Sequence, residues 1–175
     1  MTETTAGFSA PSVLRDEHDL SVFACGELVL DDWLRERALD NIRLGASRTY
    51  VTCPAGSRIV VGYYALAMGS ILAAEVPGSM RRNMPRMIPA VVLGRLAVDH
   101  RYQRHGLGAS LLQDAVLRSI RAAADVSARI MLVHALSSAA EAFYARHGFV
   151  RLPVETPTLA LDLVRFAALA DPASR

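Results

Sequence analysis

A glycine-containing turn joins an apolar strand to a long helix in the second half of this chain, and this combination limits the folds open to it. The strand is predicted over residues 91–98, the turn has the sequence QRHGLG at residues 103–108, and the helix runs to about residue 124. The first N–H groups of a helix have no intrahelical partner and carry partial positive charge. Since Gly106 and Gly108 lack a Cβ atom, a ligand can approach the backbone there. The pattern therefore indicates a site for an anion, such as a pyrophosphate, at the start of this helix.

The other elements place this turn in an α/β fold. Further strands are predicted at 12–15, 48–53, 58–73, 129–135, 149–152 and 158–163, and further helices at 20–25, 30–45 and 138–148. Ser138 and Glu141 have the spacing of a capping box, and residues 75–89 are expected to form a long loop. The second half thus has the order strand, helix, strand, helix. That order permits a right-handed crossover between parallel strands, with a ligand at their carboxyl ends.

Two common phosphate-binding turns are excluded by the residues present. A P-loop requires lysine, and all 19 basic residues of this chain are arginine. A dinucleotide-binding turn has three glycines in the pattern G-x-G-x-x-G near the start of a βαβ unit, whereas this turn has two glycines and lies past the middle of the chain.

Length and composition indicate one domain. The chain has 175 residues and a net charge of +2, and we expect a single domain over residues 1–166 with a flexible tail at 167–175. Cys25 and Cys53 are too few for a disulfide framework, and no metal-ligand spacing is present, so no metal is expected. The N-terminus lacks the pattern of a signal peptide, and no stretch is long enough to span a bilayer. We expect a cytoplasmic protein.

The segments around the turn resemble the GNAT acyltransferase family. The resemblance rests on LAVD at residues 96–99, the turn itself, and FYARHGF at residues 143–149. It implies a GNAT fold with a mixed, mostly antiparallel sheet flanked by helices and a parallel strand–helix–strand half that binds acetyl-CoA. It also implies that Tyr144 is the general acid. The implied thioester-binding backbone is Leu96, Ala97 and Val98, and the implied pyrophosphate-binding amides are Gln103, Arg104, His105, Gly106, Leu107 and Gly108.

Nearly the whole chain is similar to the TacT-type GNAT toxins of bacterial toxin–antitoxin pairs. The similarity includes GRLAVD at 94–99 and, in the N-terminal half, FACG at 23–26, LDDWL at 30–34 and VGYY at 61–64. It implies transfer of an acetyl group from acetyl-CoA to the α-amino group of aminoacyl-tRNA, a ribbon-helix-helix antitoxin as partner, and a homodimer. Many members of this family have glycine where this chain has Arg104. Because that position contributes mainly its backbone, we expect acetyl-CoA binding to survive the difference.

Arginines supply the positive charge that a tRNA substrate requires. Residues 81–104 contain six arginines and a single acidic residue, Asp99, and arginine binds phosphate well. Aromatic residues make up only 6% of the chain, which argues against reading of single-stranded bases and favours recognition by shape and charge. The candidates for tRNA binding are Arg35, Arg37 and Arg43 on the early helix and Arg81, Arg82 and Arg86 in the long loop.

The sequence leaves the identity of a general base open. An α-amino group titrates near 7.7–8.0 and is partly neutral already, so the reaction does not demand a strong base. His134 at a strand end and Glu75 in the long loop are the candidates, and a purely structural role for His134 is the alternative.

Two other functions also stay open. One is acetylation of a small amine or of a protein N-terminus, and the other is a non-catalytic module that acts in toxin–antitoxin assembly and DNA-bound repression.

Overall fold

The computed structural model describes residues 7–170, and its strands form a sheet with the order β1-β2-β3-β4-β5-β7-β6. The β4–β5 pair is parallel, and the β1–β2, β2–β3, β5–β7 and β6–β7 pairs are antiparallel. The predicted mixed, mostly antiparallel α/β architecture is therefore confirmed. The chain divides into two compact units. Unit 1 holds the described residues through Ala67 together with Gly94–Ala115, and unit 2 holds Met68–Leu93 and the described residues from Val116 onward.

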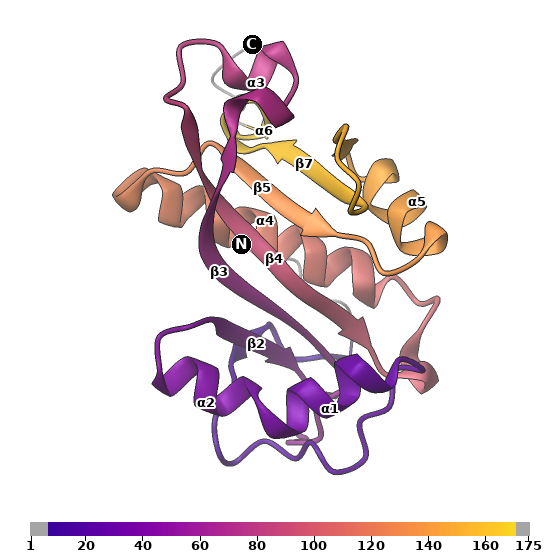
Figure 1. Cartoon of the computed structure of the whole chain (residues 1–175). Helices are drawn as coiled ribbons and strands as arrows, with labels where there is room; N and C mark the ends of the chain where they lie inside the picture. The colour runs from indigo at the N-terminus through magenta and orange to yellow at the C-terminus, as the bar shows by residue number, and fades with distance from the viewer. Residues whose placement is uncertain (1–6, 171–175) are drawn as a thin grey trace. The chain divides into compact units, whose positions relative to one another are not determined.

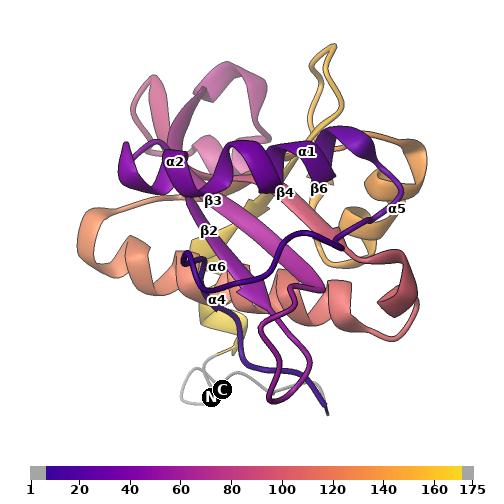
Figure 2. The ribbon, with the colours of Figure 1, turned by 90° about the horizontal axis from the view of Figure 1, so that it is seen from below.

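Unit 1 combines short strands with two consecutive helices. β1 (Ser12–Val13) pairs with β2 (Arg48–Thr52), and β2 pairs with the first part of β3 (Gly62–Leu72), which confirms the predicted hairpin. The helices α1 (Leu28–Glu36) and α2 (Ala38–Arg43) follow one another, and α2 packs against β2 (Figure 2). The buried core of this unit consists of Leu14, Phe23, Leu34, Ala38, Val51, Cys53, Val60, Tyr63 and Ala97.

The single helix predicted over residues 30–45 is interrupted. Arg37 has φ −123° and ψ −29°, outside the helical region, and separates α1 from α2. Both helices pack against the same core, through Leu34 in α1 and Ala38 in α2, so the apolar spacing continues across the break and conceals it in the sequence. The predicted stop at Gly45 is correct, because this residue follows α2 with φ +70°.

The helix predicted over residues 20–25 is wrong. The Asp19 carboxylate accepts hydrogen bonds from the backbone N–H (2.9 Å) and the hydroxyl (2.6 Å) of Ser21, which stabilises a turn instead. The backbone of Ala24 and Cys25 bonds to groups outside this segment. The Cys25 N–H donates to the Asp31 carboxylate at 2.9 Å, and the Ala24 carbonyl accepts from the His100 N–H at 2.8 Å. Those tertiary bonds replace the local bonds of a helix.

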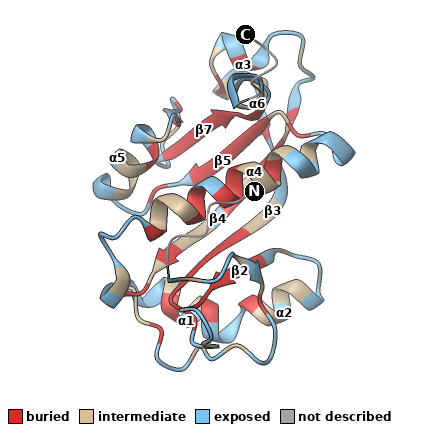
Figure 3. Ribbon diagram, turned by 180° about the vertical axis from the view of Figure 1, so that it is seen from behind, coloured by how far each residue is buried: buried red, intermediate tan, exposed pale blue. Residues whose placement is uncertain are grey.

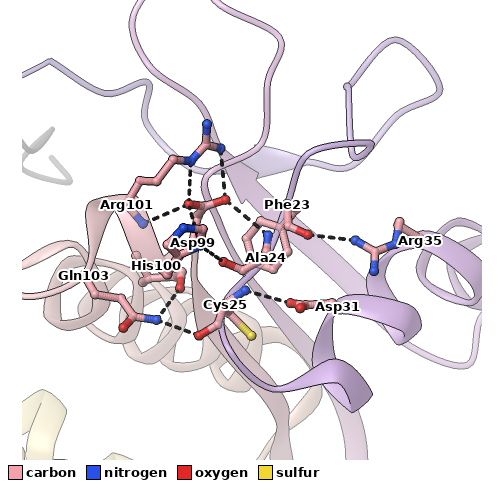
Figure 4. Close-up of polar contacts among 10 residues, drawn as sticks. Phe23, Ala24, Cys25, Asp31, Arg35, Asp99, His100, Arg101 and Gln103 are labelled. Carbon is pink, nitrogen blue, oxygen red and sulfur yellow. Dashed lines mark hydrogen bonds and ion pairs between the residues drawn. The ribbon is translucent and has the colours of Figure 1, made fainter.

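A buried carboxylate at the end of β4 (Met87–Val98) ties this N-terminal segment to the glycine turn (Figure 4). Asp99 is 0% exposed and accepts hydrogen bonds from the Arg101 Nε (2.9 Å), Nη2 (3.0 Å) and backbone N–H (3.0 Å) and from the Ala24 N–H (3.2 Å). Burial alone would raise the pKa of Asp99, but these hydrogen bonds outweigh it and hold the pKa below its usual value. The carboxylate therefore stays charged at neutral pH and fixes the chain that enters the turn.

Unit 2 places β5 (Ile130–His134) between β4 and β7 (Thr158–Asp162), with β6 (Val150–Arg151) on the far side of β7 (Figure 1). β7 is buried throughout, and β5 is buried except at His134 (Figure 3). The parallel pairing joins Ala90–Leu93 to Ile130–Val133. The crossover between these strands runs through α4 (Leu107–Val126), which begins in unit 1, ends in unit 2 and confirms the predicted helix.

The long loop predicted over residues 75–89 contains more regular structure than expected. The 3₁₀ turn η1 (Ala73–Glu75) and the short helix α3 (Gly78–Arg81) occupy its first part, and β4 already begins at Met87. These segments cover a core that includes Val76, Met80 and Ile88. The burial of these apolar side chains stabilises regular structure in this segment. The prolines and arginines of its sequence do not indicate that structure.

The C-terminal helices also differ in detail. The N-cap of helix α5 (Ser138–Arg146) is Ser137 and not Ser138 as the capping box predicted, and the Ser137 hydroxyl accepts a hydrogen bond from the Ala140 N–H at 3.1 Å. Glu141 is therefore not part of a capping box and instead forms an ion pair with Arg151 at 3.2 Å. A last helix, α6 (Leu163–Ala170), was missed, so residues 167–170 are helical, and 171–175 lie outside the described residues.

The Asp99 network leads to a prediction about stability. Because the pKa of Asp99 is lowered in the folded state, its contribution is fully present above the unfolded value of about 3.9 and is lost as the pH falls through the folded value. We expect Asp99→Asn to lower the free energy of unfolding at pH 7 by about 1–3 kcal/mol and to flatten its fall between pH 5 and pH 2. Urea unfolding measured across this pH range, with Asp125→Asn at an exposed aspartate as control, tests this. An Asp99→Asn protein with wild-type stability at pH 7 would contradict it.

Candidate functional site

The turn that precedes α4 has the backbone geometry of an anion site. The 3₁₀ turn η2 (His100–Tyr102) leads into Gln103, and the residues from Gln103 to Gly106 are exposed. The Ser110 N–H donates to the Gly106 carbonyl at 3.1 Å, which is the first bond of the α4 ladder. The amides of Leu107, Gly108 and Ala109 precede that bond and therefore have no acceptor within the helix. They lie at the positive end of a helix of 20 residues.

The backbone conformation of Arg104 shows why glycine is favoured at this position and what arginine costs there. Arg104 has φ +63° and Gly106 has φ +82°, so both residues are in the left-handed region. Glycine adopts this region without penalty, whereas a residue with a Cβ atom pays about 1 kcal/mol. The arginine therefore keeps the turn conformation that glycine supports, with its side chain at the exposed surface.

The Gln103 side chain braces the turn against the strand before it (Figure 4). Its Nε2 donates to the Val98 carbonyl at 2.9 Å and to the Cys25 carbonyl at 2.8 Å. Unit 1 thus brings together two of the predicted site segments, the backbone at Leu96–Val98 and the turn at 103–108. The sequence pattern predicted a role for the backbone of Gln103 and did not predict these hydrogen bonds of its side-chain amide.

Tyr144, the predicted general acid, lies in α5 in unit 2. It is only 6% exposed and packs edge-on against Phe143 and Phe149, with ring centroids 5.2 and 5.5 Å away. Burial raises the pKa of Tyr144 above its usual value, so the hydroxyl stays protonated well beyond neutral pH. Its hydroxyl makes no hydrogen bond to any described residue, and its proton is therefore not committed to a neighbour within residues 7–170.

Unit 2 also contains an open groove of about 770 Å³ lined by residues of β3, β4, β5 and the segment between β6 and β7. Both base candidates from the sequence, His134 and Glu75, line it, together with Glu155 and residues of β3 and β4. The His134 Nδ1 lies 2.9 Å from the Thr158 hydroxyl, which itself donates to the Thr156 carbonyl at 3.0 Å. The two threonines were not recognised from the sequence, because only the β5–β7 pairing places Thr158 beside His134.

The candidate arginines differ in how far their charge is already neutralised. Arg35 donates to the Phe23 carbonyl at 2.7 Å and pairs with Asp32 at 3.1 Å, and Arg43 pairs with Asp16 and Asp40 at 2.9 and 3.2 Å. Four other candidates are exposed and have no acidic partner within the described residues: Arg37, Arg81, Arg82 and Arg86.

Arg95 is an additional half-buried arginine that the sequence pattern did not single out. Its guanidinium carbon lies 4.2 Å from the ring centroid of Trp33, and it has no acidic partner among residues 7–170. The Trp33 ring in turn stacks on Tyr63, with centroids 6.1 Å apart. A cation held on an indole face in this way is stabilised without a carboxylate.

The two cysteines do not provide a nucleophile. Both are free thiols; burial, together with Asp31, raises the pKa of Cys25 to about 12, and burial raises the pKa of Cys53. Thiolates are the reactive form, so neither side chain is suited to carry an acetyl group. Within residues 7–170, no cluster of three or more His, Cys, Asp or Glu residues could hold a metal ion. No helix in this part of the chain is long and apolar enough to cross a membrane.

Comparison with known proteins is consistent with this geometry. The family model for the acetyltransferase (GNAT) domain matches residues 55–151. A protein of Mycobacterium tuberculosis described as a tRNA-acetylating toxin is 48% identical over 150 residues, which cover 86% of this chain and 89% of that protein.

Solved structures with the same architecture include two of AtaT. The complex of AtaT with acetyl-methionyl-tRNAfMet has a TM-score of 0.87 and 30% identity and covers 94% of this chain and 99% of that one. A tyrosine-to-phenylalanine mutant of AtaT, bound to the C-terminus of the antitoxin AtaR and acetyl-CoA, has a TM-score of 0.78 and 29% identity, covering 93% of this chain and 97% of that one. With more than half of its length matched by the family model and a 48% identical relative, the chain belongs to the GNAT family of acetyltransferases.

Proposed function

We propose that this protein is a toxin that moves an acetyl group from acetyl-CoA to the α-amino group of aminoacyl-tRNA and thereby blocks translation. The observation that carries the proposal is the 48% identity, over 86% of the chain, to a tRNA-acetylating toxin. The similarity to AtaT, solved with acetyl-methionyl-tRNA, supports the same acceptor. A GNAT domain over residues 1–166 performs the transfer in the cytoplasm, where charged tRNA is used.

Acetyl-CoA is the cosubstrate, and its pyrophosphate binds the amides of residues 103–108. The unpaired N–H groups at the start of α4 and the helix dipole favour an anion there, and a Cβ atom at Gly106 would meet nothing within 4 Å, so the approach is open. The hydrogen bond from the Gln103 side-chain amide to the Val98 carbonyl holds this turn against the end of β4. The backbone of Leu96, Ala97 and Val98 binds the thioester, and a strand amide stabilises the oxyanion that forms when the amine attacks.

Tyr144 is the general acid that protonates the leaving CoA thiolate. As the C–S bond breaks, the sulfur takes the proton of the Tyr144 hydroxyl. The Tyr144 hydroxyl is protonated over the whole physiological pH range, as an ordinary tyrosine also is, so a proton is present for the transfer. The lack of a hydrogen-bond partner among the described residues leaves that proton free to transfer.

The tRNA is held through its phosphates by arginines whose charge is not already neutralised. Arg37, Arg81, Arg82 and Arg86 meet this condition and are the main contributors, while Arg35 and Arg43, which already pair with aspartates, contribute less. Because the enzyme acts on the charged end of tRNA, shape and charge recognition of the acceptor stem is sufficient.

The toxin is held inactive by an antitoxin, for which we propose the ribbon-helix-helix type, and it functions as a homodimer. AtaT, which shares this architecture, was solved with the C-terminus of its antitoxin AtaR. Size-exclusion chromatography with light scattering measures the oligomeric state.

The first prediction concerns the acceptor. Incubation of the protein with acetyl-CoA and total charged tRNA should yield acetylated aminoacyl-adenosines after nuclease digestion, detected by mass spectrometry. Modification of free amines or peptides in place of tRNA would favour a small-molecule or protein N-terminal acetyltransferase. The absence of transfer to any amine, with acetyl-CoA still bound, would favour a non-catalytic assembly module.

The second prediction concerns Tyr144. Tyr144→Phe should lower acetyl transfer by about 10²–10⁴-fold, the range typical of a positioned acid. The loss should leave the fold and acetyl-CoA affinity nearly unchanged, because the hydroxyl bonds to no described residue and the phenyl ring keeps the contacts with Phe143 and Phe149. Single-turnover rates and acetyl-CoA titration measure both quantities. Wild-type turnover in the variant would refute the assignment.

The third prediction separates the arginines by their partners. Arg81→Ala and Arg82→Ala should each weaken tRNA binding and reduce the slope of log K against log salt by about 1. Arg43→Ala, which removes an arginine already paired with Asp16 and Asp40, is the matched control and should have a smaller effect on the slope. Binding measured between 50 and 200 mM salt checks this, and equal slopes for all three variants would contradict it.

A further inference from the structure

His134 lies where the groove of unit 2 meets the end of β5. Side chains alternate along a strand, so His134 shares a face with Ile130 and Leu132, which pack against Val76 and Met80 in the core of this unit. Leu132 and His134 both line the groove. Because His134 is the exposed last residue of the strand, its ring faces solvent in the groove and not the core.

The two threonines beside His134 determine which ring nitrogen carries the proton. A threonine hydroxyl has one proton, and that of Thr158 is donated to the Thr156 carbonyl at 3.0 Å. Toward His134, the same hydroxyl can therefore only accept, so the Nδ1 at 2.9 Å must be the protonated nitrogen. In a neutral imidazole the other nitrogen, Nε2, then has a free lone pair and is a proton acceptor.

The charges around the groove suit a cationic ligand. Glu75 from η1 and Glu155 from the β6–β7 connection line it with His134, and neither glutamate forms an ion pair with any residue between 7 and 170. With His134 they are the titratable side chains that line the groove within residues 7–170, and no arginine lines it. A volume of about 770 Å³ is within the range of small-molecule sites. An amino group that is partly protonated would be attracted there.

We propose that His134 is the general base of acetyl transfer and that Thr158 is its positioning residue. This inference rests on the proposed function and adds the acceptor side of the reaction. The α-amino nitrogen of the aminoacyl group enters the groove and attacks the thioester carbon. As the C–N bond forms, the nitrogen gives one proton to the His134 Nε2. As the C–S bond breaks, the CoA sulfur takes the proton of Tyr144. The exposed imidazolium then releases its proton to water, and the Tyr144 phenolate takes a proton back from water.

Imidazole is better suited to this step than a carboxylate. Imidazoles titrate near neutral pH and carboxylates about two units lower, and a general base is most effective when its pKa lies near the working pH. Glu75, the other candidate from the sequence, therefore attracts the amine without accepting its proton.

The test uses the whole protein with acetyl-CoA and total charged tRNA under single-turnover conditions. His134→Gly should lower the rate of acetyl transfer about 10²-fold, the lower end of the range for a positioned base, because the amine is partly neutral already. Added imidazole should restore part of the rate, and substituted imidazoles should restore it in proportion to their basicity. His18→Gln, which replaces a histidine on the loop after β1, is the control and should keep the wild-type rate.

A matched pair of variants tests Thr158, the positioning residue. Thr158→Val removes the hydroxyl and keeps the side-chain shape, and it should lower the rate about tenfold, equivalent to one hydrogen bond. Thr158→Ser keeps the hydroxyl and should retain nearly the wild-type rate. Acetyl-CoA affinity and circular dichroism should be the same in all variants, since none of these residues belongs to the cosubstrate site.

Several results would overturn the inference. A His134→Gly protein with the wild-type rate would do so, as would rescue that is independent of the basicity of the added imidazole, because such rescue would indicate simple filling of space. A Glu75→Gln protein that shows the larger loss would transfer the role to that residue. Wild-type protein that acetylates no charged tRNA would overturn the proposed function instead, and the role of His134 with it.

Discussion

The buried carboxylate of Asp99 is the interaction on which the cosubstrate side of this protein depends. It is fully shielded from solvent, and a buried charge is tolerated only when it is paired and hydrogen-bonded. Arg101 supplies the charge, and Ala24 supplies a further backbone donor. One side chain thereby joins the end of β4, the entry to the glycine turn and an N-terminal segment that would otherwise have no regular structure. The Gln103 side-chain amide adds to this connection, because it donates hydrogen bonds to the carbonyls of Cys25 and Val98.

Under the proposed function, each of the two compact units supplies chemically different groups. Unit 1 has the turn and helix start that favour an anion, which suits the pyrophosphate of acetyl-CoA. Unit 2 has the groove with Glu75, Glu155 and His134, which suits an amine, and it also has Tyr144. A bisubstrate acetyl transfer needs both kinds of site, because one substrate carries its charge as phosphate and the other reacts through nitrogen.

Prediction from the sequence succeeded where the determining contacts are local. The α4 helix, the β2–β3 hairpin and the strand–helix–strand half follow from apolar periodicity and glycine positions, and the structure confirms them. It failed for the helix over residues 20–25, since Ala24 bonds to Asp99, 75 residues away, and such a partner leaves no local pattern. The missed break at Arg37 has a related cause, because one continuous core accepts two helices with the same apolar spacing.

The sequence by itself determined the class of fold and the glycine turn before α4, because each is encoded by short runs of neighbouring residues. Only the tertiary structure decided which arginines are free to bind phosphate, since Arg35 and Arg43 are neutralised by partners that spacing does not reveal with certainty. It also places the Thr158 hydroxyl 2.9 Å from the His134 Nδ1, from which we infer the tautomer of His134. That depends on Thr158, a residue brought alongside by antiparallel pairing of β5 with β7, and a proton's position is set by contacts in space and not by order along the chain.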